Sequence, residues 1–372
     1  SSLAGSFAYS SSDTSVISIS SSTATVAGAG TATITATFTP TDTTNYASGE
    51  TTTSTITVAE AALTITASSP SVTYGDVVPS ISASYSGFVN SENSSALSTL
   101  PTCTTAYTRT SNAGTTPSTS CSGAAASNYS ISYVDGSVTI AQAAPTVASW
   151  SNVSKTYGAA DFTLTDPTVT GVTSSALAGS WTYSSSDSSV GSVSGSTVTV
   201  AGAGSATITA SFTPTDTTNY SLASTSMTLS VSQAALTITA SSPSVTYGDE
   251  VPSITASYSG FVNSQTSSVL STAPSCTTAY TTTSGAGTTP STSCSGAAAD
   301  NYSISYVNGA VTIAKATPTL GSWSNVSKTF GNSDYTITAP SVTGVTGSSL
   351  AGSFAYSSSD TSVISISSST AT

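Results

Sequence analysis

The amino-acid sequence predicts an all-β protein, organised as a linear array of β-sandwich modules of about 85 residues in two alternating types. Three observations support this prediction. The sequence repeats itself; short runs of Val, Ile, Thr and Tyr alternate with polar residues at a period of two; and turn residues separate these runs.

Internal repeats define the modules. Residues 1–25 recur without change as residues 348–372, and within that period the motif LTITASSPSVTYGD begins at Leu63 and again at Leu236. One module type, called A here, contains tryptophan, and the other, called B, contains cysteine. A Tyr-Gly or Phe-Gly pair recurs at Tyr74, Tyr157, Tyr247 and Phe330.

The repeats divide the chain into five parts. They are the C-terminal part of an A module (1–60), a B module (61–142), an A module (143–233), a B module (234–315) and the N-terminal part of an A module (316–372). Because both ends fall inside A modules, we expect either a segment of a much longer array or chains that exchange their free head and tail.

The expected strands include residues 31–38, 63–67, 129–134, 137–141 and 226–231, in which polar and apolar residues alternate as in half-buried strands. The pairs Asp135-Gly136 and Asn308-Gly309 predict tight hairpins, because Asp-Gly and Asn-Gly supply the positive φ that such turns need. Ala-Gly-Ala-Gly at 27–30 and 201–204 also marks turns. No stretch shows helical periodicity.

About seven short strands in each module are typical of an immunoglobulin-like sandwich. Aromatic residues that recur in the modules are therefore expected to be structural, with the tryptophans filling A cores or module junctions. These residues are Tyr74, Tyr157, Tyr247, Phe330, Trp150, Trp181 and Trp323.

Composition excludes several classes of function. The chain has sixteen acidic and four basic residues, which gives a net charge of −12. It therefore lacks the basic surface that binding to nucleic acids or anionic lipids requires. No apolar run approaches the roughly 20 residues that cross a bilayer. The chain has no histidine, the commonest proton shuttle and metal ligand near neutral pH. We therefore expect no enzyme, no metal and no cofactor.

The residues resemble known families. The B module, with LTITASSPSVTYGD, SGFVNS and ASNYSISYVDGSVTI, resembles the YGX-type MBG domain of bacterial surface proteins. The A module, with NVSKTYGAADFTL, WTYSSSDSSV and DTTNY, is similar to the bacterial Ig-like (Big-type) repeats of giant adhesins. The resemblance implies a fold rather than a ligand, and these families carry no catalytic residues to transfer. The cysteines of the B modules depart from the family pattern.

The four cysteines fall in the B modules at one spacing, Cys103 with Cys121 and Cys276 with Cys294. A metal site would need closer cysteines or histidine partners. We expect disulfides within each module, which stabilise by roughly 3 kcal/mol for a loop of this length. Disulfides form in an oxidising compartment, so the protein is expected to be exported.

Other polar residues have structural and functional interpretations. Lys155 and Lys328 occupy equivalent positions in A, and either flank a strand or form an isopeptide crosslink. Asp42 and Asp216 are expected to cap turns. Acidic residues are too dilute for a calcium loop within a module, although a site shared by two modules stays open.

The expected function is mechanical: the chain forms part of a long extracellular bacterial fibre or adhesin stalk, attached to a cell surface or filamentous. Its partners are neighbouring copies of the same repeat, in one chain or in polymerised chains. The alternative is an array of adhesive modules whose Thr-rich faces, such as residues 31–39, bind glycans or another surface.

Overall fold

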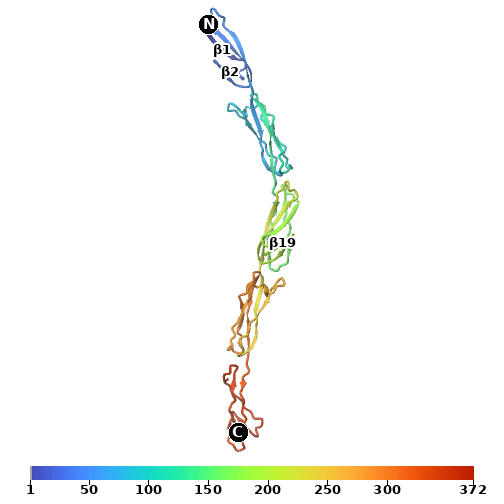
Figure 1. The fold of residues 1–372 in the computed structure, drawn as a ribbon, viewed down its shortest axis with the longest axis vertical. Helices are drawn as coiled ribbons and strands as arrows, with labels where there is room; N and C mark the ends of the chain where they lie inside the picture. Colours follow the sequence, from blue (N-terminus) through green and yellow to red (C-terminus); the bar gives the residue numbers. More distant parts are fainter. Residues whose placement is uncertain (1) are drawn as a thin grey trace. The chain divides into compact units, whose positions relative to one another are not determined.

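The computed structural model describes residues 2–372, and their regular structure is β-strand apart from two short 3₁₀ helices, η1 (Ser94–Ala96) and η2 (Ser267–Val269) (Figure 1). The prediction of an all-β protein is confirmed. No helix in this part of the chain is long or apolar enough to cross a membrane. The chain divides into two compact units. The first comprises the described part of 1–150 with 166–182 and 210–225, and the second comprises 151–165, 183–209 and 226–372.

The sheets fall into five groups along the chain, called groups 1 to 5, and no sheet among the described residues joins two groups. Group 1 has sheets β1-β4-β5 and β2-β3. Its strands are β1 (Gly5–Ser11), β2 (Ile17–Ser20), β3 (Thr23–Val26), β4 (Gly30–Pro40) and β5 (Glu50–Val58). Val16, Ile17 and Ala32 form its buried core.

Groups 2 and 4 share one topology. Group 2 has sheets β11-β6-β8, β12-β10-β9 and β13-β7, and group 4 has β25-β23-β28, β26-β27-β29 and β24-β30. The strands of group 2 are β6 (Ala61–Ala67), β7 (Ser71–Thr73), β8 (Ala83–Ser86), β9 (Thr102–Thr105), β10 (Ser118–Ser122), β11 (Tyr129–Val134), β12 (Gly136–Ser137) and β13 (Thr139–Ala141). Those of group 4 are β23 (Ala234–Ala240), β24 (Ser244–Thr246), β25 (Ala256–Ser259), β26 (Ser275–Thr278), β27 (Ser291–Ser295), β28 (Tyr302–Val307), β29 (Gly309–Ala310) and β30 (Thr312–Ala314).

Group 3 has a four-stranded sheet, β15-β22-β21-β18, a three-stranded sheet, β16-β20-β19, and the pair β14-β17. Its strands are β14 (Thr146–Val147), β15 (Val153–Thr156), β16 (Phe162–Thr163), β17 (Val169–Thr170), β18 (Gly179–Ser185), β19 (Gly191–Ser194), β20 (Thr197–Val200), β21 (Gly204–Pro214) and β22 (Ala223–Ser232). Its residues are divided between the two units.

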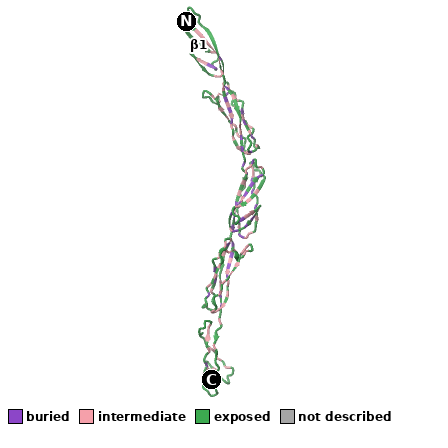
Figure 2. Ribbon diagram, viewed as in Figure 1, coloured by how far each residue is buried: buried purple, intermediate pink, exposed green. Residues whose placement is uncertain are grey.

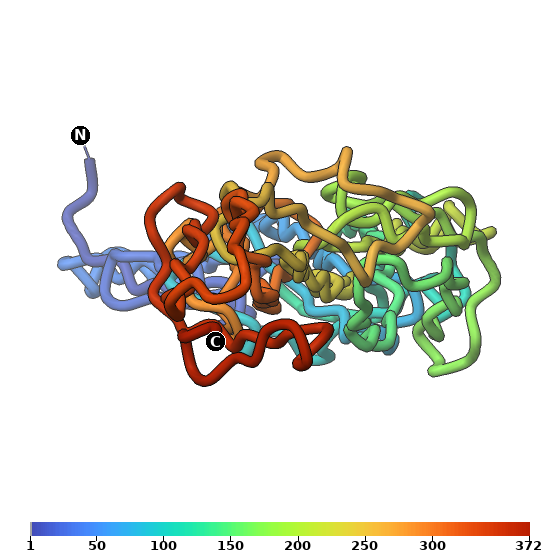
Figure 3. Tube along the Cα trace, turned by 90° about the horizontal axis from the view of Figure 1, so that it is seen from below, coloured from blue at the N-terminus to red at the C-terminus, as the bar shows by residue number. Residues whose placement is uncertain are grey.

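Group 5 contains the least regular structure. Its strands are β31 (Thr319–Leu320), β32 (Tyr335–Thr336), β33 (Val342–Thr343), β34 (Ile366–Ser367) and β35 (Thr370–Ala371), each only two residues long. Outside these short strands, residues 316–372 run mainly as loops. This segment is red in Figure 3.

Alternating apolar residues place the core between facing sheets. In β6, Leu63, Ile65 and Ala67 are buried, while the residues between them are half-buried, as the period of two predicts. Figure 2 shows buried (purple) and half-buried (pink) stretches within the domains. Cys121 of β10, in the other sheet, packs in the same cluster. In group 3, a Cβ on Gly191 of β19 would meet the side chain of Leu229 in β22, so these two sheets also pack face to face.

The predicted hairpins at Asp135-Gly136 and at the equivalent Asn308-Gly309 are both wrong. β11 pairs in parallel with β6, whereas β12, directly after Gly136, pairs with β10 in the other sheet. The chain crosses between sheets here, and neither residue has a positive φ. Gly136 is instead required by crowding, because a Cβ would lie 2.7 Å from Thr119 Oγ1 and 2.8 Å from the Ala67 carbonyl oxygen.

Candidate functional site

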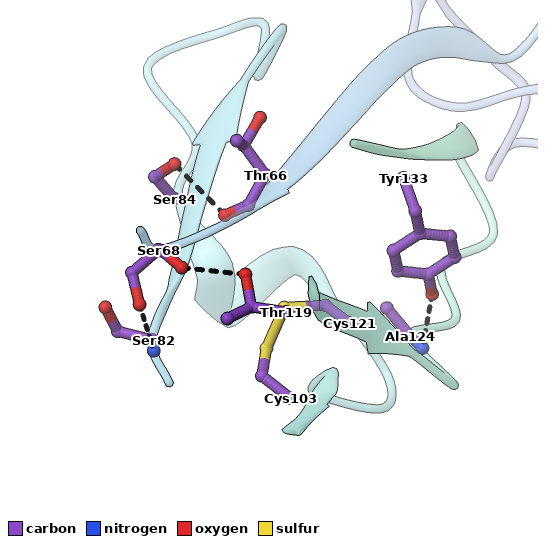
Figure 4. The surroundings of a disulfide bond; sticks show 9 residues. All are labelled: Thr66, Ser68, Ser82, Ser84, Cys103, Thr119, Cys121, Ala124 and Tyr133. Carbon is purple, nitrogen blue, oxygen red and sulfur yellow. Dashed lines mark hydrogen bonds between the residues drawn. A yellow bond between two sulfur atoms is a disulfide. The ribbon is translucent and has the colours of Figure 1, made fainter. Parts of the chain in front are cut away.

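Each cysteine pair lies directly opposite across two antiparallel strands. Cys103 of β9 and Cys121 of β10 are register partners and form a disulfide (Figure 4). Cys276 and Cys294 do the same between β26 and β27. The inner cysteine of each pair, Cys121 or Cys294, is buried, so the disulfide joins two strands of sheet β12-β10-β9 or β26-β27-β29 on the side that faces the core.

Hydroxyl groups beside each disulfide tie the two sheets together. The buried Thr119, on the disulfide strand β10, donates from Oγ1 to the Ser68 carbonyl oxygen at 2.8 Å (Figure 4). Thr292 makes the same bond to Ser241 in group 4 at 2.8 Å. Buried hydroxyl groups need such partners, because an unpaired one costs free energy.

The recurring aromatic residues occupy three kinds of place. Tyr247 packs in the apolar cluster of Tyr280, Val311 and Ile313, and Trp181 packs on Phe212 with ring centroids 5.0 Å apart. Tyr74 and Tyr157 lie where successive groups meet, as described below. Trp150 is half-buried.

Two of the predicted structural aromatics are not packed as core residues. The Trp323 side chain is 56% exposed, and Phe330 is fully exposed. Trp323 donates from Nε1 to the Thr338 carbonyl oxygen at 3.0 Å and lies beside Tyr356. The physical reason is that group 5 has no counterparts of the long strands β21 and β22, which cover the apolar side of group 3.

Asparagine side chains join successive groups. Asn128 of group 2 accepts a hydrogen bond at Oδ1 from the backbone N–H of Ala29 in group 1, at 2.9 Å. Asn301 of group 4 accepts one from Ala203 of group 3, at 2.7 Å. Gly28 is required in this loop because a Cβ there would lie 2.6 Å from the Ser15 carbonyl oxygen and 2.9 Å from Asn128 Oδ1.

The contact between groups 2 and 3 is the most enclosed. Asn219 is 6% exposed and accepts at Oδ1 from the Ala113 N–H at 2.9 Å. Its Nδ2 donates to Asp216 Oδ2 at 2.8 Å and to Asn112 Oδ1 at 3.1 Å. Both the oxygen and the nitrogen of the Asn219 amide therefore bond to the preceding group, and the nitrogen also donates within its own turn.

A tyrosine pair accompanies two of these contacts. Tyr74 of group 2 meets Tyr220 of group 3 edge to face, with centroids 5.5 Å apart. Tyr157 of group 3 meets Tyr302 of group 4 in the same way at 5.7 Å, and its Oη accepts from Gln265 Nε2 at 2.9 Å. Such aromatic pairs contribute about 0.5–1.5 kcal/mol beyond their buried area.

The sequence analysis missed the asparagines, although a signal was present. An Asn-Tyr pair occurs once in each of groups 1 to 4, at Asn45, Asn128, Asn219 and Asn301. In the last three of these pairs the asparagine reaches the preceding group, and Tyr220 and Tyr302 pack against that group as well.

The carboxylates and lysines singled out in the sequence make contacts within their own groups. Asp42 and Asp216 cap their turns, accepting from the backbone N–H groups of Asn45 and Asn219. The Lys155 ammonium lies over the Phe162 ring, and Lys328 lies over Tyr335. Within residues 2–372, no three His, Cys, Asp or Glu side chains are placed to hold a metal ion.

Threonine side chains form a ladder across group 1. In the antiparallel pair β4-β5, Thr31, Thr33, Thr35 and Thr37 lie opposite Thr57, Thr55, Thr53 and Thr51. The corresponding strands of group 3, with the sequences GSATITASFTP and ASTSMTLSVS, mix serine with threonine. A glycan- or surface-binding role for this face stays a prediction.

Comparison with known families identifies groups 2 and 4. Residues 63–139 and 236–312 match the family model described as MBG domain (YGX type). These two segments are MBG domains. The predicted resemblance of the B modules is thereby confirmed, and the disulfides described above lie inside both MBG domains. No curated protein sequence is significantly similar to the chain.

Three solved structures match this chain at low TM-scores. A Drosophila N-cadherin EC1-4 structure is 9% identical, with 82% of this chain and 92% of that chain covered and a TM-score of 0.25. Four N-terminal Ig domains of Dscam1 isoform 8.4 are 10% identical, with 83% and 91% covered and a TM-score of 0.20. Domains 4–9 of surface layer protein SbsC are 10% identical, with 92% and 45% covered and a TM-score of 0.17, so this chain spans less than half of that structure. TM-scores this low support no inference about function.

Proposed function

We propose that this chain is a structural repeat region of an extracellular bacterial fibre or adhesin stalk, acting as a spacer without catalysis. The observation that carries the proposal is the recurrence of one contact between successive groups. At each of three successive contacts, an asparagine Oδ1 accepts a backbone N–H of the preceding group. A repeated, directional contact sets how each domain meets the next, which a spacer needs and a flexible linker does not provide.

Surface composition supports the same proposal. Only 5% of the residues are charged, and four are basic, so the polar side chains of the chain are mainly Ser and Thr hydroxyls. Two disulfides stabilise the MBG domains and are typical of exported proteins.

Small-angle scattering tests the proposal. A second chain would carry an additional copy of residues 61–233, inserted in tandem. If the contacts between domains are stiff, the maximum dimension of the longer chain should exceed that of the original chain in proportion to the number of added domains. The length of each added domain follows from its strands, which rise about 3.3 Å per residue. Growth with the square root of length, as for a flexible chain, would contradict a spacer role.

A further inference from the structure

The strands at the two ends of each MBG domain pair with one another in parallel. In group 2, β6 pairs with β11 over six residues, from Ala61 opposite Tyr129 to Thr66 opposite Val134. The following strand, β7, pairs in parallel with the last strand, β13, over three residues. Group 4 repeats both ladders, β23 with β28 and β24 with β30. We call the two parallel ladders of a domain its terminal clamp.

Backbone hydrogen bonds beyond the strands lengthen the shorter ladder. In group 2, the Thr139 N–H donates to the Pro70 carbonyl oxygen at 3.0 Å, and the Tyr74 N–H donates to the Ala141 carbonyl oxygen at 2.9 Å. In group 4, the same bonds run from Thr312 to Pro243 at 3.0 Å and from Tyr247 to Ala314 at 2.9 Å. The clamp is therefore the same in both MBG domains.

Parallel pairing decides how the clamp responds to tension along the chain. Tension draws β6 toward its N-terminal end and β11 toward its C-terminal end, and these ends lie at opposite ends of the ladder. The two strands are therefore pulled past each other, and all six residue pairs carry the load together. In an antiparallel hairpin such as β4-β5, both pulled ends lie at one edge, so the pairs open one after another.

Group 3, which lies between the MBG domains in the sequence, has a shorter ladder of the same kind. Its strand β15 pairs in parallel with β22 over four residues, 153–156 opposite 229–232. The Tyr157 N–H adds one bond, to the Ser232 carbonyl oxygen at 2.8 Å. The longest parallel ladder thus has four residue pairs in group 3 and six in each MBG domain. Because the load is shared, a longer ladder needs a higher force to open.

The disulfide of each MBG domain lies outside the clamp. Cys103 and Cys121 join β9 to β10, in the sheet that contains neither β6 nor β11 (Figure 4). The two cysteines are 18 positions apart, so the bond prevents about 60 Å of extended chain from being pulled out, at roughly 3.4 Å per residue. The clamp and the disulfide therefore act at different stages, the first before a domain opens and the second afterwards.

We propose that each MBG domain is a tension-bearing unit: its terminal clamp resists stretching of the chain, and its disulfide limits how far the domain unravels once the clamp opens. This inference rests on the proposed spacer function and adds a load to it. A spacer between a surface and a distant attachment point is stretched whenever the two are pulled apart, and only domains that hold under that force keep the distance fixed.

Optical tweezers test the proposal on the full chain, held by handles at its two ends. Forced unfolding reports the rate of opening rather than equilibrium stability. Group 3 has no cysteine and releases all of residues 143–233, so its event is longer than that of an MBG domain. The MBG domains are expected to open at about 1.5-fold higher force than group 3, if residue pairs share the load equally. Opening at the same or a lower force overturns the proposal.

Replacing Cys103 and Cys121 together by serine separates the two roles. The event of the first MBG domain should lengthen by about 60 Å, which also distinguishes it from the second. Its opening force should stay unchanged, because the disulfide acts on the unfolded chain and carries no load before the clamp opens. A fall in the opening force, or an unchanged length, contradicts the proposed division of roles.

A clamp variant in this serine background tests the ladder itself. Thr139→Pro removes the N–H that donates to Pro70, whereas the matched control, Ala106→Pro, removes the N–H that donates to Ser118 at 2.9 Å in the disulfide sheet. Both replaced residues are exposed. Thr139→Pro should lower the opening force of the first domain below that of the second, and Ala106→Pro should not. Equal losses would refute the clamp.

The comparison between groups needs no variant, so it decides the proposal even if a proline variant fails to fold. The spacer function is tested separately. Scattering from the unstretched chain reports the stiffness of contacts between groups, whereas pulling reports the opening of single domains, so each proposal can fail without the other.

Discussion

Asn219 Oδ1 accepts a hydrogen bond from the backbone N–H of Ala113, a residue 106 positions earlier in the preceding MBG domain. The asparagine is buried, and its Nδ2 is held by Asp216 of its own turn. Removing the side chain would leave a buried N–H without a partner. Such contacts make the stability of one domain depend on its neighbour.

We expect Asn219→Ala to lower the free energy of unfolding by about 1–3 kcal/mol, the usual cost of an unpaired buried donor. Asn45→Ala is the matched control, since it removes the same residue from the same TDTTNY turn where the side chain is exposed. Urea unfolding at low protein concentration measures both. Equal losses would mean that Asn219 acts only within its own turn.

Both disulfides are expected to close within their own domains. Peptide mapping by mass spectrometry without reduction should link Cys103 to Cys121 and Cys276 to Cys294. Replacing Cys103 and Cys121 together by serine should destabilise the first MBG domain by roughly 3 kcal/mol, with the second domain as an internal reference. Free thiols, or a link between domains, would refute the pairing.

Stability is expected to fall in acid. The Ser189 hydroxyl, then the Ser189 N–H, hold the pKa of Asp187 below its ordinary value, and Asp13 and Asp360 have equivalent serine donors. The unfolded chain therefore binds more protons, and the free energy of unfolding rises with pH in this range. The contribution is present above about pH 4, the ordinary pKa of Asp, and is lost as the pH falls through the lower folded value.

Urea unfolding between pH 2 and pH 7 measures this effect. Ser189→Ala removes the leading donor, so its free energy of unfolding should fall less steeply below pH 4 than that of the wild type. Parallel curves for the two proteins would count against the Asp187 contribution.

Trypsin should distinguish two lysines in nearly identical sequences. Lys155 lies in β15 within SWSNVSKTYG, whereas Lys328 lies in SWSNVSKTFG, where no strand forms. Cleavage requires local opening, so we expect Lys328 to be cut at least tenfold faster. Mass spectrometry of the first fragments reads this out, and equal rates would show that β15 gives no protection.

The module boundaries predict that residues 143–315 form an independent fragment. Every strand of groups 3 and 4 finds its partners within this range. We expect a folded monomer with a cooperative unfolding transition, measured by light scattering and circular dichroism. Aggregation of this fragment, at concentrations where the whole chain stays soluble, would require different boundaries.

Much of the fold could be predicted from residues alone. The alternation in LTITA places Leu63, Ile65 and Ala67 on one face, and the structure buries that face. The strand at 129–134 has the predicted bounds. Local alternation suffices in these cases because a sheet with one apolar face leaves one register that buries it.

Sequence by itself determined the repeat, the all-β class and the positions of most strands, because these depend on composition and local period. Only the tertiary structure decided which strands form and how domains meet. GSFAYSS is a strand at 5–11 and a loop at 352–358, since a strand needs a partner for its backbone hydrogen bonds. Asp135-Gly136 crosses between sheets rather than turning back, and Asn219 bonds to Ala113 across domains, because both depend on residues distant in sequence.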